Sequence, residues 1–449
     1  MKHLLLIFIF FVIFQTMTFA QEEWTFDKCL DFALKHNIAL KTEKLNSEIT
    51  KSDYRQAYYN LLPSAAANGT HSYNYGKTID QATYTYVSSN ESGNINASLN
   101  LTVFSGFQEV MAIFRNKYAY NATIQDIEKV RIEISANLLN SFLMVLNYSE
   151  LLQFSKNQYE VSKEQSVRTR MLYDMGKLSQ NDYLNIKASE ALDKEKLLIA
   201  ENDYKHNFLL LTQLMNYDSI MSFKISKPEN LMMDTTVLSI AYDQIYQKAE
   251  QQLPYLKSAE WRLKSAQKNL SVIKGALSPT LSVGYGYSSF YSQISANPDN
   301  IAGQPPLPYA YINQIKDNAG TQFYINLNIP IFDRFSRIGN IRKAKLNLSL
   351  AENQVNQTRQ TLSKDLQKLY LDAQNSLAKY NTKKETMAAM DEIYKYSGEQ
   401  FGLGLLSSLE YKIAKSSYET ALSELIQAKF ETEYMLKIID FYMTNRISL

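Results

Sequence analysis

The sequence is poor in the residues that break regular structure. Its 449 residues include 14 Gly and 9 Pro, whereas average usage would supply roughly 54 of the two together. So few breakers exclude a many-stranded sandwich or propeller, a collagen and a low-complexity linker, because each of these needs frequent turns or a Gly/Pro-rich composition. The chain must instead contain long uninterrupted elements, which in practice means long helices.

The chain also has few cysteines and histidines and a small net charge, and each of these features excludes a class of function. The single cysteine, Cys29, excludes an intrachain disulfide and a cysteine-based zinc site. The net charge of +2 provides no global basic field, so no nucleic-acid partner is expected. Beyond the N-terminus only His36, His71 and His206 remain, far apart, and no P-loop, Rossmann or HExxH motif occurs. We therefore expect no metal site, no cofactor and no enzyme activity.

The N-terminus has the pattern of a targeting segment. Lys2 stands before an apolar run, Leu4 to Phe14, and the small residue Ala20 precedes a polar stretch. These features predict a secretory signal peptide over residues 1–20, and hence an exported protein. The apolar run is shorter than the roughly 20 residues that cross a bilayer as a helix, so an N-terminal anchor is the less favoured alternative.

The few breakers are unevenly placed. Neither Gly nor Pro occurs in 107–175, 177–227, 340–397 or 405–449. A helix over the first of these stretches would be roughly 100 Å long at about 1.5 Å per residue, which suggests coiled-coil packing. Apolar residues within it, such as Ile134, Leu138, Phe142 and Val145, recur at helical spacing.

Sparse identities recur at fixed offsets, which indicates an internal repeat. Asp27 and Asp243 are 216 residues apart, whereas further on Tyr183 and Tyr411 are 228 apart. The difference, 228 − 216 = 12, corresponds to an insertion between Pro279 and Leu327. We therefore expect a signal peptide (1–20), repeat 1 (21–215), a linker (216–240) and repeat 2 (241–449), each repeat with a helix, two membrane strands (about 64–104 and about 280–332) and two long helices that turn near 176 and near 404.

Four short segments have a period of two instead of the helical period. Apolar and polar residues alternate in 95–103, 281–288 and 322–331, and more weakly in 64–75. In an exported chain this pattern predicts transmembrane β-strands with lipid on one face and water on the other, although a half-buried sheet of a soluble protein is the alternative. Four strands cannot close a barrel in lipid, so a barrel would have to be shared between subunits.

Three sets of residues together resemble the bacterial outer-membrane efflux (TolC-like) family. Residues 24–37, which begin Trp-Thr-Phe-Asp and end in Asn, are similar to the opening helix of that family. Residues 61–64 (Leu-Leu-Pro-Ser) and 277–280 (Leu-Ser-Pro-Thr) resemble its helix-to-strand junctions. Residues 173–179 (Tyr-Asp-Met-Gly-Lys-Leu-Ser) and 401–407 (Phe-Gly-Leu-Gly-Leu-Leu-Ser) resemble its helix–turn–helix tips. The resemblance covers essentially the whole mature chain.

The resemblance implies a fold, a location and partners. The fold is mainly α with a small β part: a long α-helical coiled-coil barrel, plus four antiparallel transmembrane strands per chain. Three chains would form a homotrimer with one 12-stranded β-barrel in outer-membrane lipid, and the helices would extend into the periplasm of a Gram-negative bacterium. The implied partners are a periplasmic adaptor protein and an inner-membrane pump of the RND or ABC type.

The resemblance also assigns roles to individual residues. Pro63 and Pro279 end a helix where a strand begins, which suits a residue that restricts the backbone before it. Gly176 and Gly404 permit a tight reversal with positive φ. The residues implied in adaptor docking are the tip residues Gly176, Leu178, Ser179, Gly404, Leu406 and Ser407.

Two carboxylates follow the tips and are candidates for the periplasmic entrance. Asp182 and Glu410 each stand six residues beyond a tip glycine. In the family, acidic residues at such positions line or lock the entrance, and rings of carboxylates favour cations. The alternative is charge matching at a helix N-terminus. The sequence departs from the best-known acidic pattern of the family at Ile413, three residues after Glu410, where a second carboxylate would stand, and this weakens the case for a gate with two rings.

These features predict a passive trimeric exit duct of a tripartite efflux pump that carries small molecules from pump and adaptor across the periplasm and outer membrane. The duct of a type I protein secretion system is an alternative of the same class. An exported structural or adhesive coiled-coil protein is the alternative of another class, and the alternating strands argue against it.

Overall fold

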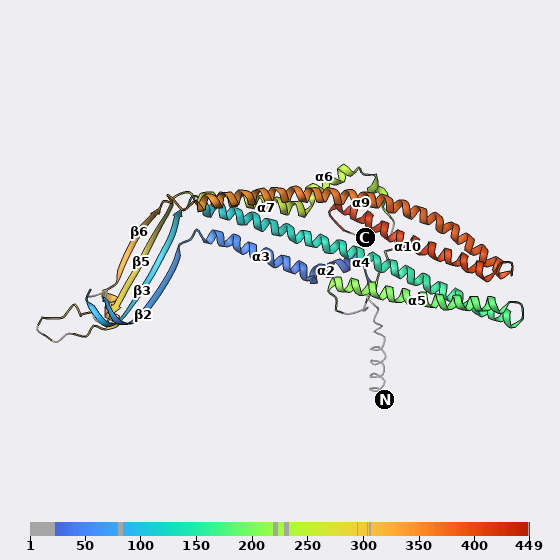
Figure 1. Ribbon diagram of the computed structural model, residues 1–449, viewed down its shortest axis with the longest axis horizontal. Coiled ribbons are helices and arrows are strands. Elements are labelled where there is room, and N and C mark those ends of the chain that lie inside the picture. The colour runs from blue at the N-terminus through green and yellow to red at the C-terminus, as the bar shows by residue number, and fades with distance from the viewer. Residues whose placement is uncertain are drawn as a thin grey trace, which may run out of the picture. The chain divides into compact units, whose positions relative to one another are not determined.

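The computed structural model describes residues 23–79, 84–218, 223–228, 233–293, 295–302, 304, 307–447 and 449. The predicted signal peptide lies outside these residues, as do residues 219–222 and 229–232 of the predicted linker. The elements are β1 (Glu23–Trp24), α2 (Phe26–His36), α3 (Ile38–Tyr59), β2 (Ser64–Ile79), β3 (Tyr86–Phe104), α4 (Gln108–Asp174), α5 (Gln180–Met215), β4 (Lys224–Ile225), η1 (Thr235–Ser239), α6 (Tyr242–Gln252), α7 (Pro254–Gly275), β5 (Thr280–Ser292), α8 (Tyr311–Asp317), β6 (Gly320–Asn328), α9 (Ser336–Gly402) and α10 (Ser408–Thr444). The expectation of a mainly helical chain with a small antiparallel sheet is confirmed (Figure 1).

The chain forms two compact units that do not coincide with the sequence repeats. The helical unit comprises Met1–Leu45, Gln125–Lys257 and Asn356–Leu449, and the sheet unit comprises Asn46–Ile124 and Ser258–Val355. Each repeat therefore contributes to both units.

The long helices follow the breaker-free stretches. Helices α4 and α9 contain 67 residues each, α5 contains 36 and α10 contains 37. Asn216 and Asn445 are the C-cap residues that follow α5 and α10, and they adopt the left-handed conformation that asparagine tolerates better than most residues. Among the described residues, no helix combines the length and apolar character needed to cross a membrane.

The core of the helical unit is built on the apolar stripe of α4. Leu138 and Phe142 are fully buried, and they pack in one cluster with Phe26 and Cys29 of α2 and Phe208 of α5. Burial raises the pKa of the Cys29 thiol to about 12, so this cysteine is an inert core residue. The sequence did not predict the parallel pairing of β1 with β4, which brings Trp24 onto Phe223 with ring centroids 4.4 Å apart.

The opening helix of each repeat is interrupted at an equivalent position. Asn37 separates α2 from α3, and its side-chain Oδ1 accepts a hydrogen bond from the backbone N–H of Leu40 at 3.2 Å. Leu253, which is 216 residues further on, separates α6 from α7. Pro254 then opens α7, where its missing N–H costs nothing.

The sheet unit contains one four-stranded antiparallel sheet in the order β2-β3-β5-β6. Strands β2 and β5 begin directly after Pro63 and Pro279. The register aligns Leu99 with Tyr285 and Tyr285 with Phe323, so the alternating apolar residues of three strands share one face. The asparagines and serines between them share the other face.

Two features of the sheet unit differ from the expectation. Strand β6 ends at Asn328, so the predicted alternation overshoots, because Pro330 lacks an N–H for the ladder and restricts the residue before it. The region of the insertion includes the short helix α8, whose buried Gln314 accepts a hydrogen bond from the backbone N–H of Ser292 at 3.0 Å. A helix of 7 residues has too little periodicity to be recognised in a sequence.

Two glycines allow the chain to approach itself closely within the sheet unit. Gly106 lies between β3 and α4 with φ +65°. A Cβ at this position would lie 2.3 Å from the carbonyl oxygen of Gly275 and 2.6 Å from Cβ of Ser278. These contacts bring the end of the second strand in repeat 1 against the end of the helix that precedes the first strand of repeat 2.

Gly106→Ala is expected to destabilise the sheet unit by about 1–3 kcal/mol from its positive φ alone, and the overlap with Gly275 adds to this cost. The apparent melting temperature of the purified protein measures the effect. Gly339→Ala is the control, because Gly339 lies in α9 with open space around its Cβ position and helical alanine is more stable than glycine. Equal melting temperatures for Gly106→Ala and wild type would contradict the close approach.

Candidate functional site

The two turns that join the long helices form the candidate site, and both lie at the same end of the helical unit (Figure 1). Gly176 has φ +73° and Gly404 has φ +74°. The N–H of Gly176 donates to the carbonyl of Tyr173 at 2.8 Å, and the N–H of Gly404 donates to the carbonyl of Phe401 at 3.0 Å. Each glycine thus ends a helix in a left-handed cap, which leaves room for a tight reversal.

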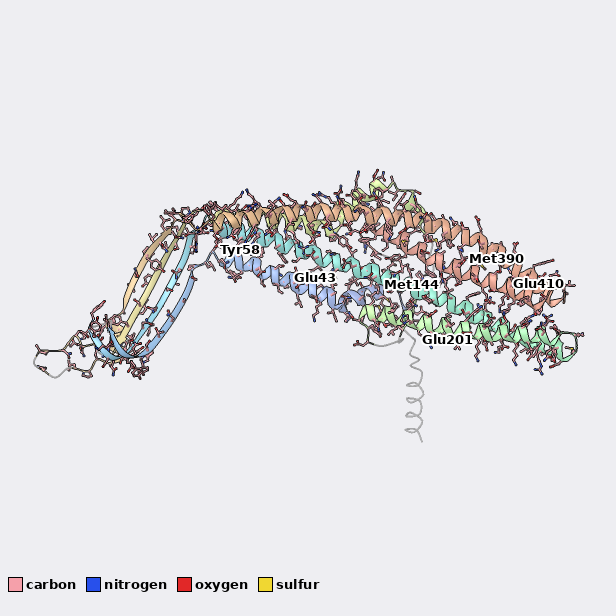
Figure 2. All side chains as sticks on the ribbon, viewed as in Figure 1. Glu43, Tyr58, Met144, Glu201, Met390 and Glu410 are labelled. Carbon is pink, nitrogen blue, oxygen red and sulfur yellow. The ribbon has the colours of Figure 1, made fainter. Side chains whose placement is uncertain are left out.

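Serine and a carboxylate then start the next helix in both repeats. Ser179 and Ser407 are the N-cap residues of α5 and α10. Asp182 and Ser179 are linked by two hydrogen bonds. Ser407 forms a complete capping box with Glu410, which Figure 2 labels near the end of the helical unit. These bonds to Ser179 and Ser407 are the leading cause that holds the pKa of each carboxyl below its usual range. Both carboxylates therefore serve as helix N-terminal charges, which is the local alternative that the sequence left open.

Among the described residues, Asp182 makes a further hydrogen bond that has no counterpart at Glu410. The hydroxyl of Ser408 on α10 donates to Oδ1 of Asp182 at 2.7 Å, and the side-chain amide of Asn185 donates to the same hydroxyl at 3.3 Å. Ser408 is buried. Helix α5 is thereby tied to the start of α10 by residues 226 positions apart in the sequence. Because the pKa of Asp182 is lowered, the carboxylate contributes this contact above its ordinary pKa and loses it only as the pH falls through the lowered value.

An aromatic pair supports each turn. The rings of Tyr173 and Tyr183 stack with centroids 5.5 Å apart, and the equivalent pair, Phe401 and Tyr411, stacks at 5.0 Å. The repeats differ around these pairs. In the first turn Arg170 donates to the hydroxyl of Tyr183 and to the carboxylate of Asp174, whereas glycines occupy both corresponding positions, 398 and 402, of the second.

The exposed apolar side chains at the turns are not the ones that the sequence singled out. Leu178 and Leu406 are half-buried. The strongly exposed residues are Met175, Leu403 and Leu405, which are 61%, 72% and 70% exposed. Their position at the ends of breaker-free stretches, or close to them, could have indicated them, but residue type alone does not distinguish an exposed apolar side chain from a buried one.

The sequence missed a buried ion-pair network on α4, α5 and α10. Lys415 is 4% exposed, and its ammonium donates to the carboxylate of Asp193 and to the hydroxyl of Ser162, both also buried. Lys196 lies 3.5 Å from Oδ1 of Asp193 and donates to Oε2 of Glu419 at 2.5 Å. Such a network is costly to disrupt, because removal of one partner leaves an uncompensated charge in the interior.

Within the described part of the chain, no group of three or more His, Cys, Asp or Glu residues is placed to hold a metal ion. His71 instead lies 3.1 Å from the carboxylate of Glu91 on the neighbouring strand. The candidate site is a pair of structured helix turns.

Known proteins share this architecture. A family model described as outer membrane efflux protein matches residues 29–217 and again residues 245–433, which confirms the internal repeat. No significant match among curated proteins was found.

Solved structures align along nearly the whole chain. The outer membrane protein VceC of Vibrio cholerae aligns over 92% of this chain and 95% of its own, with a TM-score of 0.75 and 13% identity. The CmeC channel of Campylobacter jejuni aligns over 92% and 84%, with a TM-score of 0.72 and 17% identity. The open MtrE channel of Neisseria gonorrhoeae aligns over 93% and 88%, with a TM-score of 0.65 and 17% identity. At these identities the likeness establishes the fold.

Proposed function

The chain belongs to the outer membrane efflux protein family, and from this premise we propose that three copies form the passive exit duct of a tripartite pump for small molecules. As a family member it is an outer membrane protein that extends into the periplasm. The observation that carries the proposal is the two-sided character of the sheet, because one exposed face is apolar and the other is polar.

The apolar face suits contact with lipid. Leu99, Phe323, Ile325 and Leu327 lie on this face and are 47%, 67%, 65% and 59% exposed. Large aliphatic and aromatic side chains on an exposed sheet face are unfavourable in water and favourable in a bilayer.

The polar face suits a water-filled lumen, and the open edges require partner strands. Asn96, Asn100, Asn326 and Asn328 occupy the positions between the apolar residues. Within the described residues, β2 pairs only with β3 and β6 only with β5. Unpaired edges are not tolerated in lipid, so further copies of the chain must supply the missing ladders. Three copies give 3 × 4 = 12 strands, within the range of outer-membrane barrels.

The turns suit docking of an α-helical hairpin from a periplasmic adaptor. Exposed Leu403 and Leu405 in the second turn, with Met175 in the first, add apolar surface to the proposed docking residues Leu178, Ser179, Leu406 and Ser407. The energy for transport would come from an inner-membrane pump, and passage through the duct would involve no catalysis. Three copies of Asp182 and of Glu410 near a common axis would favour cations at the entrance.

Insertion into a planar lipid bilayer tests the duct. The purified protein is expected to require detergent for extraction from membranes and to produce discrete conductance steps in the bilayer. A protein that leaves the membrane without detergent, as a soluble rod, would exclude the duct and favour the structural coiled-coil alternative.

Ser408→Ala is expected to raise the single-channel conductance severalfold, and with it the uptake of large hydrophilic antibiotics. The substitution removes the hydroxyl that ties α10 to Asp182, while Asp182 keeps its bonds to Ser179 and so still caps α5. Ser417→Ala is the matched control, because Ser417 is exposed on the same helix. We propose that the hydrogen bond between Ser408 and Asp182 helps to hold the entrance closed. Equal conductance of Ser408→Ala and Ser417→Ala would contradict this role.

A further inference from the structure

The two hairpins of the sheet have the same register. In the first hairpin Ala65 of β2 lies opposite Leu99 of β3, and in the second hairpin Leu281 of β5 lies opposite Leu327 of β6. Leu281 and Leu327 correspond to Ala65 and Leu99 at the repeat offsets of 216 and 228. Every aligned pair of the second hairpin has its counterpart in the first at these two offsets. The strand pairing of one repeat therefore predicts that of the other, residue by residue.

A third ladder joins the two hairpins. It pairs β3 of repeat 1 with β5 of repeat 2, and its register aligns Leu99 with Tyr285 (Figure 1). A barrel built from several copies needs the reverse junction as well, in which β6 of repeat 2 meets β2 of repeat 1 in the next copy. Strands β2 and β6 are the two edges of the sheet, where this junction would form. Closure of a barrel fixes the tilt of its strands and the stagger between them, so equivalent junctions are expected to share one register.

We propose that β6 of one copy pairs with β2 of the next copy in the register of the junction between β3 and β5, an inference that rests on the shared barrel proposed above. Leu99 corresponds to Leu327 and Tyr285 corresponds to Gly69 at the repeat offsets, so Leu327 lies opposite Gly69 of the neighbouring copy. A shift of this register by one residue is excluded, because it would turn the apolar residues of one strand to the polar face. The register therefore differs from its nearest competitors by two residues.

Side-chain size at the two edges agrees with this register. The apolar face of β2 begins with the small residues Ala65, Ala67 and Gly69, whereas the same face of β6 carries Phe, Ile and Leu. A cavity of about 420 Å³ lies on this face of the sheet, and its lining includes the alanines of β2. In the proposed register Leu327 stands over Gly69, beside this hollow. A large side chain then fills the space that a small one leaves, as close packing requires.

The residue after β6 also gains a partner in this register. In repeat 1, Leu101 continues β3 beyond its ladder with β2 and pairs with Val283 of β5. The equivalent residue, Ile329, follows the last residue of β6 and is 56% exposed. In the proposed register Ile329 lies opposite Ala67 of the neighbouring copy. Pro330 supports this pairing, because a residue that precedes proline favours an extended backbone.

Cysteine cross-linking in isolated outer membranes tests the register, in a Cys29→Ala background that removes the one native thiol. The informative chain carries Thr70→Cys with Asn326→Cys, because the register places these residues directly opposite each other at about 4.5–5.5 Å between Cα atoms. Within one copy β3 and β5 separate the two positions by roughly 14 Å or more. A disulfide requires about 4.4–6.8 Å, so it can form only between copies. Mild oxidation is expected to join most chains into covalent multimers that survive heating in sodium dodecyl sulfate without reductant.

The matched controls are shifted by two residues along the same face of β2. Asn326→Cys with Asn68→Cys, and Asn326→Cys with Ser72→Cys, place the thiols on diagonal neighbours whose Cα atoms are about 7–8 Å apart, so these pairs should cross-link several times less. Ala67→Cys with Ile329→Cys is a second pair of the proposed register and should cross-link like the first. Conductance of each reduced variant in a planar bilayer shows that it is assembled.

The outcomes separate this register from the shared barrel on which it rests. Stronger cross-linking of a shifted pair than of Thr70→Cys with Asn326→Cys would overturn the register and leave the barrel in place. Variants that conduct but form no cross-link at either proposed pair would overturn it as well. If the protein neither conducts nor forms any covalent multimer, the shared barrel fails, and the register fails with it.

Discussion

Lys415→Met is expected to destabilise the helical unit by about 3–5 kcal/mol, the usual cost of removing one partner from a buried ion pair. The substitution leaves the buried carboxylates of Asp193 and Glu419 with Lys196 alone. Lys196 cannot replace the missing charge, because its side chain is 55% exposed and reaches the network from the solvent side. Thermal unfolding of the purified protein, followed by far-ultraviolet circular dichroism, measures the effect as a lower apparent melting temperature.

The internal repeat supplies the control for this prediction. Lys187 aligns with Lys415 at the offset of 228 but is exposed on α5. Lys187→Met should therefore change stability by no more than about 0.5 kcal/mol. A double variant, Lys415→Met with Asp193→Leu, should recover part of the loss, because removal of both charges avoids an unpaired ion. If Lys415→Met and Lys187→Met had the same apparent melting temperature, the ion-pair network would not be buried in the assembled protein.

Ile325→Lys is expected to impair assembly in the outer membrane, at a cost of about 2–4 kcal/mol per chain for a lysine facing the middle of a bilayer. Ile325 lies on the exposed apolar face of the sheet, aligned with Val283. The amount of the proposed trimer that migrates as an oligomer in sodium dodecyl sulfate without heating measures assembly. A sheet buried on a soluble core would respond to the same substitution, so the matched variant on the adjacent residue is needed.

Asn326→Lys is that variant, because Asn326 is the next residue on β6 and points to the opposite, polar face. In a duct this face lines a wet lumen, so Asn326→Lys should assemble normally and shift the ion selectivity of the channel toward anions. Reversal potentials in planar bilayers under a salt gradient measure the shift. Normal assembly of Ile325→Lys, or loss of assembly by both variants, would contradict a sheet with one lipid face and one water face.

The architecture of this chain could be predicted from its sequence because the informative signals are local. Gly176 and Gly404 mark helix reversals since few other residues adopt their positive φ, and Pro63 and Pro279 stand directly before strands since they cannot continue a helix. The alternation in β3, β5 and β6 requires only neighbours two residues apart. A signal of this kind overshot only where Pro330 ended β6 early.

Only the local contacts of the candidate site could be predicted from the sequence in the same way. Ser179 and Asp182 are three residues apart, and this spacing is enough to predict the capping hydrogen bond between them. The second partner of Asp182, Ser408, lies 226 residues away and is brought there by the packing of α5 and α10. No spacing rule could connect these two residues.

What the sequence determined alone was therefore the long helices and the four strands of the sheet, their order and their duplication. Helix length, strand alternation and turn position depend on backbone preferences over a few residues. These preferences can be predicted from the types of neighbouring residues. The tertiary structure decided which side chains are buried from solvent. Lys187 and Lys415 are the same residue at equivalent positions of the repeat, yet Lys187 is exposed on α5 and Lys415 is buried in an ion pair with Asp193. The physical reason is that burial of a charge depends on which distant helix approaches it, and that approach is a property of the packed molecule.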